Sequence, residues 1–185
     1  MKILVMGLPG SGKTYLAKRM QPILNAAWYN ADIVREMAND WDFSPEGRIR
    51  QSLRMKSLAD FEKKHGRIVI CDFVCPTHET KRNFNPDITI WMNTIKSGRY
   101  EDTNRMFESP MEVDYEVNEM NEIVWDLQLT DEINRAHQYS VNYLDSNIEL
   151  PSRSLTRKPP TAIGETPLQS DRDPGDVALD LLNCL

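Results

Sequence analysis

Cysteine is scarce in this chain of 185 residues, which contains only Cys71, Cys75 and Cys184. Three cysteines cannot form the kind of disulfide framework that stabilises many small secreted domains. The spacing Cys71-x-x-x-Cys75 is not accompanied by a second pair of ligands, which argues against a zinc site. We therefore expect reduced, half-buried thiols.

Long apolar runs are also absent, and no stretch approaches the length of a membrane-spanning helix. Met1 and Lys2 lead directly into a short apolar strand, a pattern that does not resemble a signal peptide. The formal net charge of -6 argues against a surface built for nucleic acid or for anionic membranes, although it leaves room for a basic cleft that holds a small anion. We expect a cytoplasmic protein whose partner is a small molecule and that binds no membrane, and the charge disfavours nucleic acid as a ligand.

The length suffices for one α/β domain with a buried core and is too short for two of ordinary size. Beyond residue 150 the apolar periodicity ends, and prolines punctuate a polar segment. We predict one folded domain over residues 1–150 and a poorly ordered or peripheral extension over residues 151–185.

The most informative segment is Gly7-Leu8-Pro9-Gly10-Ser11-Gly12-Lys13-Thr14, which fits the pattern G-x-x-x-x-G-K-[ST] of a phosphate-binding loop, or P-loop. It lies between the apolar run Ile3-Leu4-Val5-Met6 and a segment of helical character, as the motif requires. The glycines let the backbone approach a polyphosphate, and N–H groups at the start of the helix face the anion. The residues expected to hold the nucleotide are Gly7, Pro9, Gly10, Ser11, Gly12, Lys13, Thr14 and Tyr15.

The loop also predicts the cofactors, ATP and Mg²⁺. Lys13 should reach the β- and γ-phosphates, and Thr14 should ligate Mg²⁺. Asp72 ends an apolar strand at a position where many P-loop enzymes have an acid that helps to hold Mg²⁺ through water. The motif alone predicts binding of a nucleoside triphosphate and leaves the acceptor open.

Short apolar runs alternate with helical segments, which predicts a parallel sheet joined by helices. The strands expected after the first are Ala27–Tyr29, Arg67–Phe73, Ile88–Met92 and Val113–Val117, with Ile123–Leu127 as the alternative for the last. The predicted fold class is α/β, a three-layer sandwich of the P-loop NTPase type with a mainly parallel five-stranded sheet and helices on both faces. Residues 96–110 are expected to form a mobile lid, with a plain surface loop as the alternative.

The longest predicted helix begins at Pro45, because Ser44 has the residue type and position of an N-cap. We expect it to run to about His65 and to end at Gly66. Its apolar residues predict the face that packs on the sheet: Ile49, Leu53, Leu58 and Phe61. Thr130 is expected to begin a closing helix.

Four more segments contain polar or aromatic residues suited to a ligand: Asn30-Ala31-Asp32-Ile33-Val34-Arg35, Asp42-Phe43-Ser44-Pro45-Glu46-Gly47-Arg48, Phe73-Val74-Cys75-Pro76-Thr77 and Ser97-Gly98-Arg99-Tyr100. With the P-loop they resemble, in matching order over roughly residues 2–117, the motifs of adenylylsulfate kinases. In that family the first segment reads D-G-D-N-V-R, so Asn30 stands here in place of its first acid. The other departures fall at Gln51, Thr77 and Ser97.

The resemblance implies a P-loop kinase domain that transfers phosphate from ATP to the ribose 3′-hydroxyl of adenylyl sulfate, with Lys13 and Asp32 as catalytic residues. Asp32 would orient or deprotonate the acceptor hydroxyl; the structural alternative is that it caps the following helix. Arg35 and Arg48 would bind the acceptor's phosphate and sulfate. The substrate-binding residues implied are Asp32, Arg35, Phe43, Arg48, Gln51, Phe73, Val74, Cys75, Arg99 and Phe107.

Two other functions stay open. One is a small P-loop kinase acting on a nucleoside or on the 5′-hydroxyl of a polynucleotide. The other is a nucleotide-binding module without catalysis, which the departures at Asn30, Gln51, Thr77 and Ser97 motivate. A homodimer is compatible with the sequence, which does not determine the oligomeric state.

Overall fold

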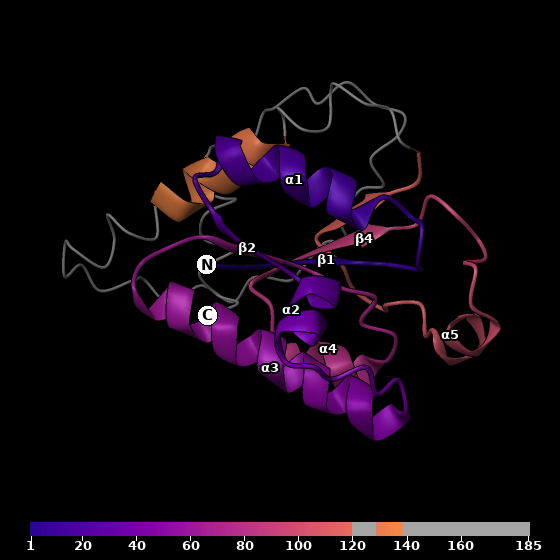
Figure 1. The fold of residues 1–185 in the computed structure, drawn as a ribbon. Coiled ribbons are helices and arrows are strands. Elements are labelled where there is room, and N and C mark those ends of the chain that lie inside the picture. The colour runs from indigo at the N-terminus through magenta and orange to yellow at the C-terminus, as the bar shows by residue number, and fades with distance from the viewer. Residues whose placement is uncertain (120–128, 139–185) are drawn as a thin grey trace, which may run out of the picture.

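The computed structural model of the chain describes residues 1–119 and 129–138, and its elements form three layers with a sheet in the middle (Figure 1). The strands are β1 (Lys2–Met6), β2 (Ala27–Asn30), β3 (Val69–Asp72), β4 (Ile88–Met92) and β5 (Tyr115–Val117). The helices are α1 (Lys13–Ile23), α2 (Ala31–Met37), α3 (Pro45–Lys64), α4 (His78–Phe84) and α5 (Glu101–Met106). Residues 129–138 are also helical. The alternative strand at 123–127 and the extension over 151–185 lie outside the described residues.

The sheet has the strand order β2-β3-β1-β4-β5, and every neighbouring pair is parallel. The predicted α/β class and the five-stranded parallel sheet are therefore confirmed. β1 lies in the centre and is buried along its whole length, as its continuous apolar run predicts for a strand covered on both faces. Because all strands run the same way, their carboxyl ends meet at one edge of the sheet, where ligands bind in open α/β folds.

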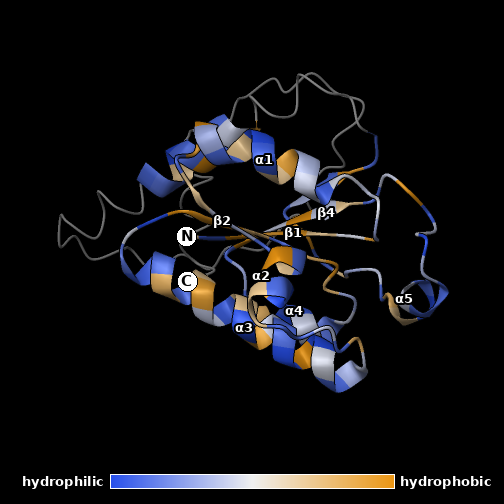
Figure 2. Ribbon diagram, in the orientation of Figure 1, coloured by the Kyte–Doolittle hydropathy of each residue, from blue (hydrophilic) through white to orange (hydrophobic). Residues whose placement is uncertain are grey.

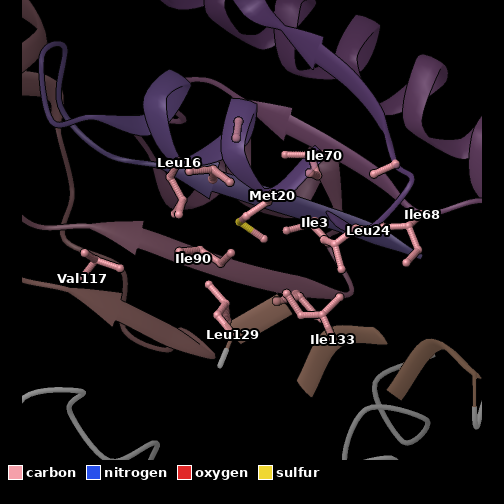
Figure 3. Packing of buried hydrophobic residues seen from close by; sticks show 14 of the residues in the cluster. Ile3, Leu16, Met20, Leu24, Ile68, Ile70, Ile90, Val117, Leu129 and Ile133 are labelled. Carbon is pink, nitrogen blue, oxygen red and sulfur yellow. The ribbon is translucent and has the colours of Figure 1, made fainter. Parts of the chain in front are cut away.

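One face of the sheet is covered by α1 and by the helical residues 129–138. Leu16, Met20 and Leu24 pack against alternate residues of the strands (Figure 3). Leu129 and Ile133 join the same cluster, which confirms a helix near the predicted start at Thr130. The larger buried side chains of this layer fix the position of α1 and, with it, the loop that precedes the helix.

The opposite face is covered by α2, α3 and α4, as Figure 1 shows below the sheet. The cluster on this side includes Met6, Met55 and Phe84. It also includes both described cysteines, Cys71 and Cys75, which are free and fully buried. The expectation of half-buried thiols was wrong because both residues belong to segments that lie inside this layer.

The helix α3 follows the predicted boundaries, since Ser44 accepts a hydrogen bond from the Gly47 N–H and Pro45 begins the helix. The predicted buried stripe was wrong at Leu53, which is 46% exposed, and at Phe61, which is 61% exposed, whereas Leu58 is partly buried and packs against the cluster on this face. Apart from Met55, the residues that face the interior are small or polar: Gly47, Gln51, Ser52, Ala59 and Glu62. Figure 2 shows the resulting mixed hydropathy along α3.

The helix α2 begins at Ala31, directly after β2. Asn30 is its N-cap, and the Asn30 Oδ1 accepts hydrogen bonds from the backbone N–H groups of Asp32 and Ile33. The structural alternative for Asp32, a capping role, is therefore wrong, and Asp32 lies in the first turn of the helix.

Residues 96–110 contain a short helix, α5, which lies to one side of the main layers (Figure 1). The Asn104 side chain organises the loop before it by bonding to both the N–H and the carbonyl of Gly98 and to the Ser97 hydroxyl. The mobility of this segment stays a prediction. No helix in residues 1–119 and 129–138 is long and apolar enough to cross a membrane.

The burial pattern of α3 gives a stability prediction with an internal control. Met55→Ala should lower the free energy of unfolding by about 2–5 kcal/mol, because Met55 is fully buried and its truncation leaves a cavity. Leu53→Ala, two residues away on the exposed face, should change it by less than about 0.5 kcal/mol. Urea unfolding of the two variants measures both effects, and a larger loss for Leu53→Ala would show that the helix faces are assigned wrongly.

Candidate functional site

The loop between β1 and α1 passes closely under the end of β4. Gly7 has φ 142°, and a Cβ atom built on it would lie 2.5 Å from the Met92 carbonyl oxygen. Gly12, the N-cap of α1, has φ 92°, which is left-handed backbone that side chains rarely adopt. These two glycines let the loop curl so that the amino end of α1 faces the carboxyl edge of the sheet.

Lys13 lies within this loop with its side chain largely buried. Its Nζ donates to the Leu8 carbonyl oxygen at 2.8 Å, a bond across the loop itself. Burial lowers the pKa of Lys13 to about 8, and the charges of Asp72 and Asp32 partly oppose this effect. The ammonium group is therefore short of compensating charge, and an anion at the loop would supply it.

Thr14 begins a hydrogen-bond network that joins α1 to two strands. Its hydroxyl donates to Asp72 Oδ2 at 2.6 Å. Asn30 Nδ2 donates to the same carboxylate oxygen at 2.9 Å, and Trp28 Nε1 donates to Asp72 Oδ1 at 2.7 Å. Burial raises the pKa of Asp72, and the bonds from Thr14, Trp28 and Asn30 lower it in part.

The oxygens of Thr14 and Asp72 suit Mg²⁺, a hard cation that binds through one or two protein oxygens together with substrate phosphates. The described ranges 1–119 and 129–138 hold no group of three or more His, Cys, Asp or Glu residues that could enclose a metal ion by themselves. The site thus fits a cation that arrives with a nucleotide better than one held by the protein alone.

Asp32 lies on the exposed side of the first turn of α2, beside this network. Because β2 ends at the same edge of the sheet as β1, Asp32 lies on the side of the sheet edge where the P-loop begins α1, and its charge partly opposes the lowering of the Lys13 pKa. A solvent-accessible carboxylate at this position can accept a hydrogen bond from a bound hydroxyl group.

Arg35 was expected to bind an acceptor anion, but in the structure its side chain donates hydrogen bonds to backbone carbonyl groups. Its guanidinium donates to the carbonyl oxygens of Asp40 and Asp42, both at 2.9 Å, and of Gly47 at 3.4 Å. The side chain is buried, and its guanidinium carbon lies 4.7 Å from the centre of the Phe43 ring. In this conformation Arg35 holds the loop between α2 and α3 in shape.

Arg48 connects that loop to the segment around α5. Its Nε donates to the Phe43 carbonyl, and one terminal nitrogen donates to Asp102 Oδ2 at 2.9 Å and to Thr103 Oγ1 at 3.1 Å. Arg48 also lies 5.8 Å from the centre of the Phe43 ring, so the half-exposed ring contacts two guanidinium groups. A small hollow of about 60 Å³ opens beside Arg48, lined also by Pro45, Ile49, Pro76, Thr77, Glu79, Thr80 and Met106.

The other residues predicted to bind the substrate differ in how far a ligand could reach their side chains. Gln51 is buried, and its Nε2 donates to the Ala31 carbonyl. Phe73 and Cys75 are buried in the cluster between the sheet and the helices α2, α3 and α4. The Val74 carbonyl accepts a hydrogen bond from the Gly7 N–H, so the segment Phe73–Cys75 supports the P-loop. Arg99 is exposed near Tyr100, and Phe107 is partly buried.

Sequence reasoning missed three residues of the site. Trp28 bonds to Asp72, Asn104 organises the loop around Gly98, and Asp102 pairs with Arg48. A signal existed only for Trp28, which lies two residues before Asn30 on the same strand and so on the same side of it. The other two depend on contacts between segments far apart in the sequence.

Comparison with known proteins identifies relatives of the chain. A sequence model of the family described as "Adenylylsulphate kinase" matches residues 1–94. The chain is 33% identical over 84 residues to a probable adenylyl-sulfate kinase of Aeropyrum pernix, and 36% identical over 81 residues to an adenylyl-sulfate kinase of Chloroflexus aurantiacus. Each match covers 40% of this chain and 44% of the relative, so the chain spans less than half the length of these proteins in the match.

Solved structures show the same fold at low identity. An APS kinase of Mycobacterium tuberculosis, in complex with AMPPNP and APS, has a TM-score of 0.52 and 16% identity, over 78% of this chain and 97% of that one. A hexameric APS kinase from Thiobacillus denitrificans has a TM-score of 0.57 and 19% identity, over 74% of this chain and 29% of that one. Because the family model matches just over half of its residues, the chain belongs to the adenylylsulphate kinase family.

Proposed function

We propose that the protein is an ATP-dependent kinase that phosphorylates the ribose 3′-hydroxyl of adenylyl sulfate. The observation that carries this proposal is the position of Lys13 at the start of α1, after β1, and of Asp32 in the first turn of α2, after β2, which puts both residues at the carboxyl edge of the sheet. Family membership supports the reaction class, since the matched segment 1–94 contains both residues.

The P-loop and Lys13 bind the phosphates of ATP in this proposal. Phosphoryl transfer needs charge neutralisation and in-line positioning more than covalent assistance. The ammonium group of Lys13 exchanges its bond to the Leu8 carbonyl for bonds to phosphate oxygens. Thr14 and Asp72 hold Mg²⁺, which when bound neutralises charge on the phosphates.

Asp32 accepts a hydrogen bond from the acceptor hydroxyl and directs its oxygen toward the terminal phosphate. Its exposure in the free protein suits this role, because the carboxylate is reached by a ligand without rearrangement of α2. The hydroxyl proton passes to Asp32 or to solvent as the new P–O bond forms and the bond between the terminal phosphate and the leaving ADP breaks.

The acceptor lies between α2, the start of α3 and the segment around α5. Arg48 binds an anionic group of the acceptor, and the half-exposed ring of Phe43 stacks on its base. Arg35 and Gln51 shape this region through the backbone carbonyls that they bind. Arg99 and Phe107 contribute from the lid in this proposal.

Lys13→Met should abolish detectable nucleotide binding while leaving the protein folded. The change removes the cation that faces the phosphates and also removes a buried charge, so it should not lower the stability of the free protein. Calorimetric titration with ATP and Mg²⁺ measures the binding, and far-UV circular dichroism reports the fold. Unchanged ATP affinity in this variant would exclude the P-loop as the nucleotide site.

Asp32→Asn should lower kcat for phosphorylation of adenylyl sulfate on the order of a hundredfold or more, because the amide cannot accept the hydroxyl proton. Glu36→Gln is the matched control, since Glu36 is an exposed acid one turn later on α2 and should be dispensable. A coupled assay of ADP release measures both. Equal activity of the two variants contradicts the role of Asp32, and absence of turnover by the wild type with adenylyl sulfate contradicts the acceptor.

Arg48→Gln should raise KM for adenylyl sulfate about tenfold or more and change KM for ATP little, because it removes a charged bond to the acceptor only. Arg50→Gln is the control on the same helix, where the exposed guanidinium pairs with Asp40 and Asp42. If both substitutions change the two KM values alike, Arg48 acts on the fold and not on the acceptor.

A further inference from the structure

The hydroxyl group of Thr14 has one bonding position left. A hydroxyl offers one hydrogen to donate and two lone pairs to accept with. Its hydrogen is directed to Asp72 Oδ2 at 2.6 Å, and one lone pair accepts from Asn30 Nδ2 at 3.2 Å. The remaining lone pair is available to a metal ion that accompanies a nucleotide.

Asn30 is engaged at both ends of its amide, which fixes the orientation of the group. Its Oδ1 accepts from the N–H groups of Asp32 and Ile33, both of which can only donate. Its Nδ2 faces the carboxylate of Asp72 at 2.9 Å, which accepts. An aspartate at position 30 would keep the cap of α2 but would bring a second carboxylate oxygen to the place of the nitrogen.

Asp72 is the one acid in this network, and it is 2% exposed. Asn30 and Asp72 are register partners on the adjacent parallel strands β2 and β3. Trp28, two residues before Asn30, donates its indole N–H to the oxygen of Asp72 that Thr14 does not use. The carboxylate is thus held at both oxygens, and its rotation is prevented.

We propose that Asn30 and Asp72 form a matched amide–carboxylate pair in which β3 supplies the single acid beside Thr14, and that Trp28 is the positioning residue of that acid. The pair explains the departure from the family's D-G-D-N-V-R segment at Asn30, since the acid has moved one strand across the sheet. The inference rests on the proposed binding of a metal–nucleotide complex and does not depend on which acceptor is used.

The pair is tested by exchanging its members. In metal-free buffer, Asn30→Asp should lower the melting temperature by roughly 5 °C, because a second carboxylate then faces the buried carboxylate of Asp72. Asp72→Asn should weaken the binding of Mn²⁺ to the ADP-saturated protein by about tenfold or more, measured by electron paramagnetic resonance. The double variant Asn30→Asp/Asp72→Asn restores one acid and one amide, so it should recover most of both losses.

The role of Trp28 is tested by Trp28→Phe, which keeps an aromatic ring for packing and for the nearby Lys18 but removes the N–H donor. It should weaken Mn²⁺ binding about threefold to tenfold without changing the affinity for ADP measured in the absence of metal. A purely structural role would leave Mn²⁺ affinity unchanged.

Asn93→Asp is the matched control, because the Asn93 amide donates to the Glu116 carboxylate at 2.7 Å near the ends of β4 and β5 without contacting Thr14. It should leave Mn²⁺ affinity unchanged. The proposal is overturned if Asn30→Asp is as stable as the wild type, if the double variant is no better than the worse single variant, or if Asn93→Asp weakens Mn²⁺ binding as Asp72→Asn does. If the variants show the expected changes in stability and in Mn²⁺ binding but the wild-type protein does not phosphorylate adenylyl sulfate, the proposed acceptor is wrong and the amide–carboxylate pair stands.

Discussion

Two charged groups, Lys13 and Asp72, are buried in this site, and they differ in how many hydrogen bonds compensate their burial. This difference determines which ligand the site favours. Burial of an ion is costly unless hydrogen bonds and opposite charge compensate it. Asp72 receives hydrogen bonds from three side chains, whereas the hydrogen bond found for the Lys13 ammonium goes to a single carbonyl of the loop. Both oxygens of the acid are therefore engaged in the free protein, although burial still raises the pKa of Asp72, whereas the ammonium group has N–H donors left for a ligand. The most favourable change open to such a site is the arrival of an anion at Lys13, which is what a phosphate-binding loop requires.

Because the sheet is parallel, local sequence patterns are enough to predict much of this arrangement. The strands β1, β2 and β3 each end at the same edge, so residues that follow them meet without any long excursion of the chain. The G-x-x-x-x-G-K-[ST] pattern, the apolar runs and the Ser44-Pro45 start are local signals, and each predicted its element. Polar residues at or just beyond the carboxyl ends of strands, such as Asp72 and Asp32, could be assigned to the edge for the same reason.

The failures of sequence reasoning arise where burial depends on partners distant in the chain. On α3, apolar spacing predicted a buried face that includes Leu53 and Phe61, yet the interior face contains Gln51 and Glu62. These polar side chains are buried because Gln51 bonds to the Ala31 carbonyl, and Glu62 accepts bonds from Tyr29 and Arg67. No pattern within the helix reports those partners. The link of Trp28 to Asp72 was missed for the same reason, because it depends on the register of β2 against β3.

In the region proposed to bind the acceptor, some of the polar side chains are already hydrogen-bonded to the protein backbone, which leaves fewer of them to recognise a ligand. Arg35 and Gln51 are engaged with backbone carbonyls, so recognition of an anionic acceptor falls mainly to Arg48 and to the exposed groups around it. In the free protein Arg48 is bonded to Asp102, a carboxylate that is itself largely exposed and is held by little else. An acceptor anion could replace that carboxylate at small cost to Asp102, because the Asp102 side chain is 66% exposed and returns to water. Asp102 and Thr103 both belong to α5, so a ligand bound at Arg48 would lie against the same short helix that Arg48 joins to α3 in the free protein.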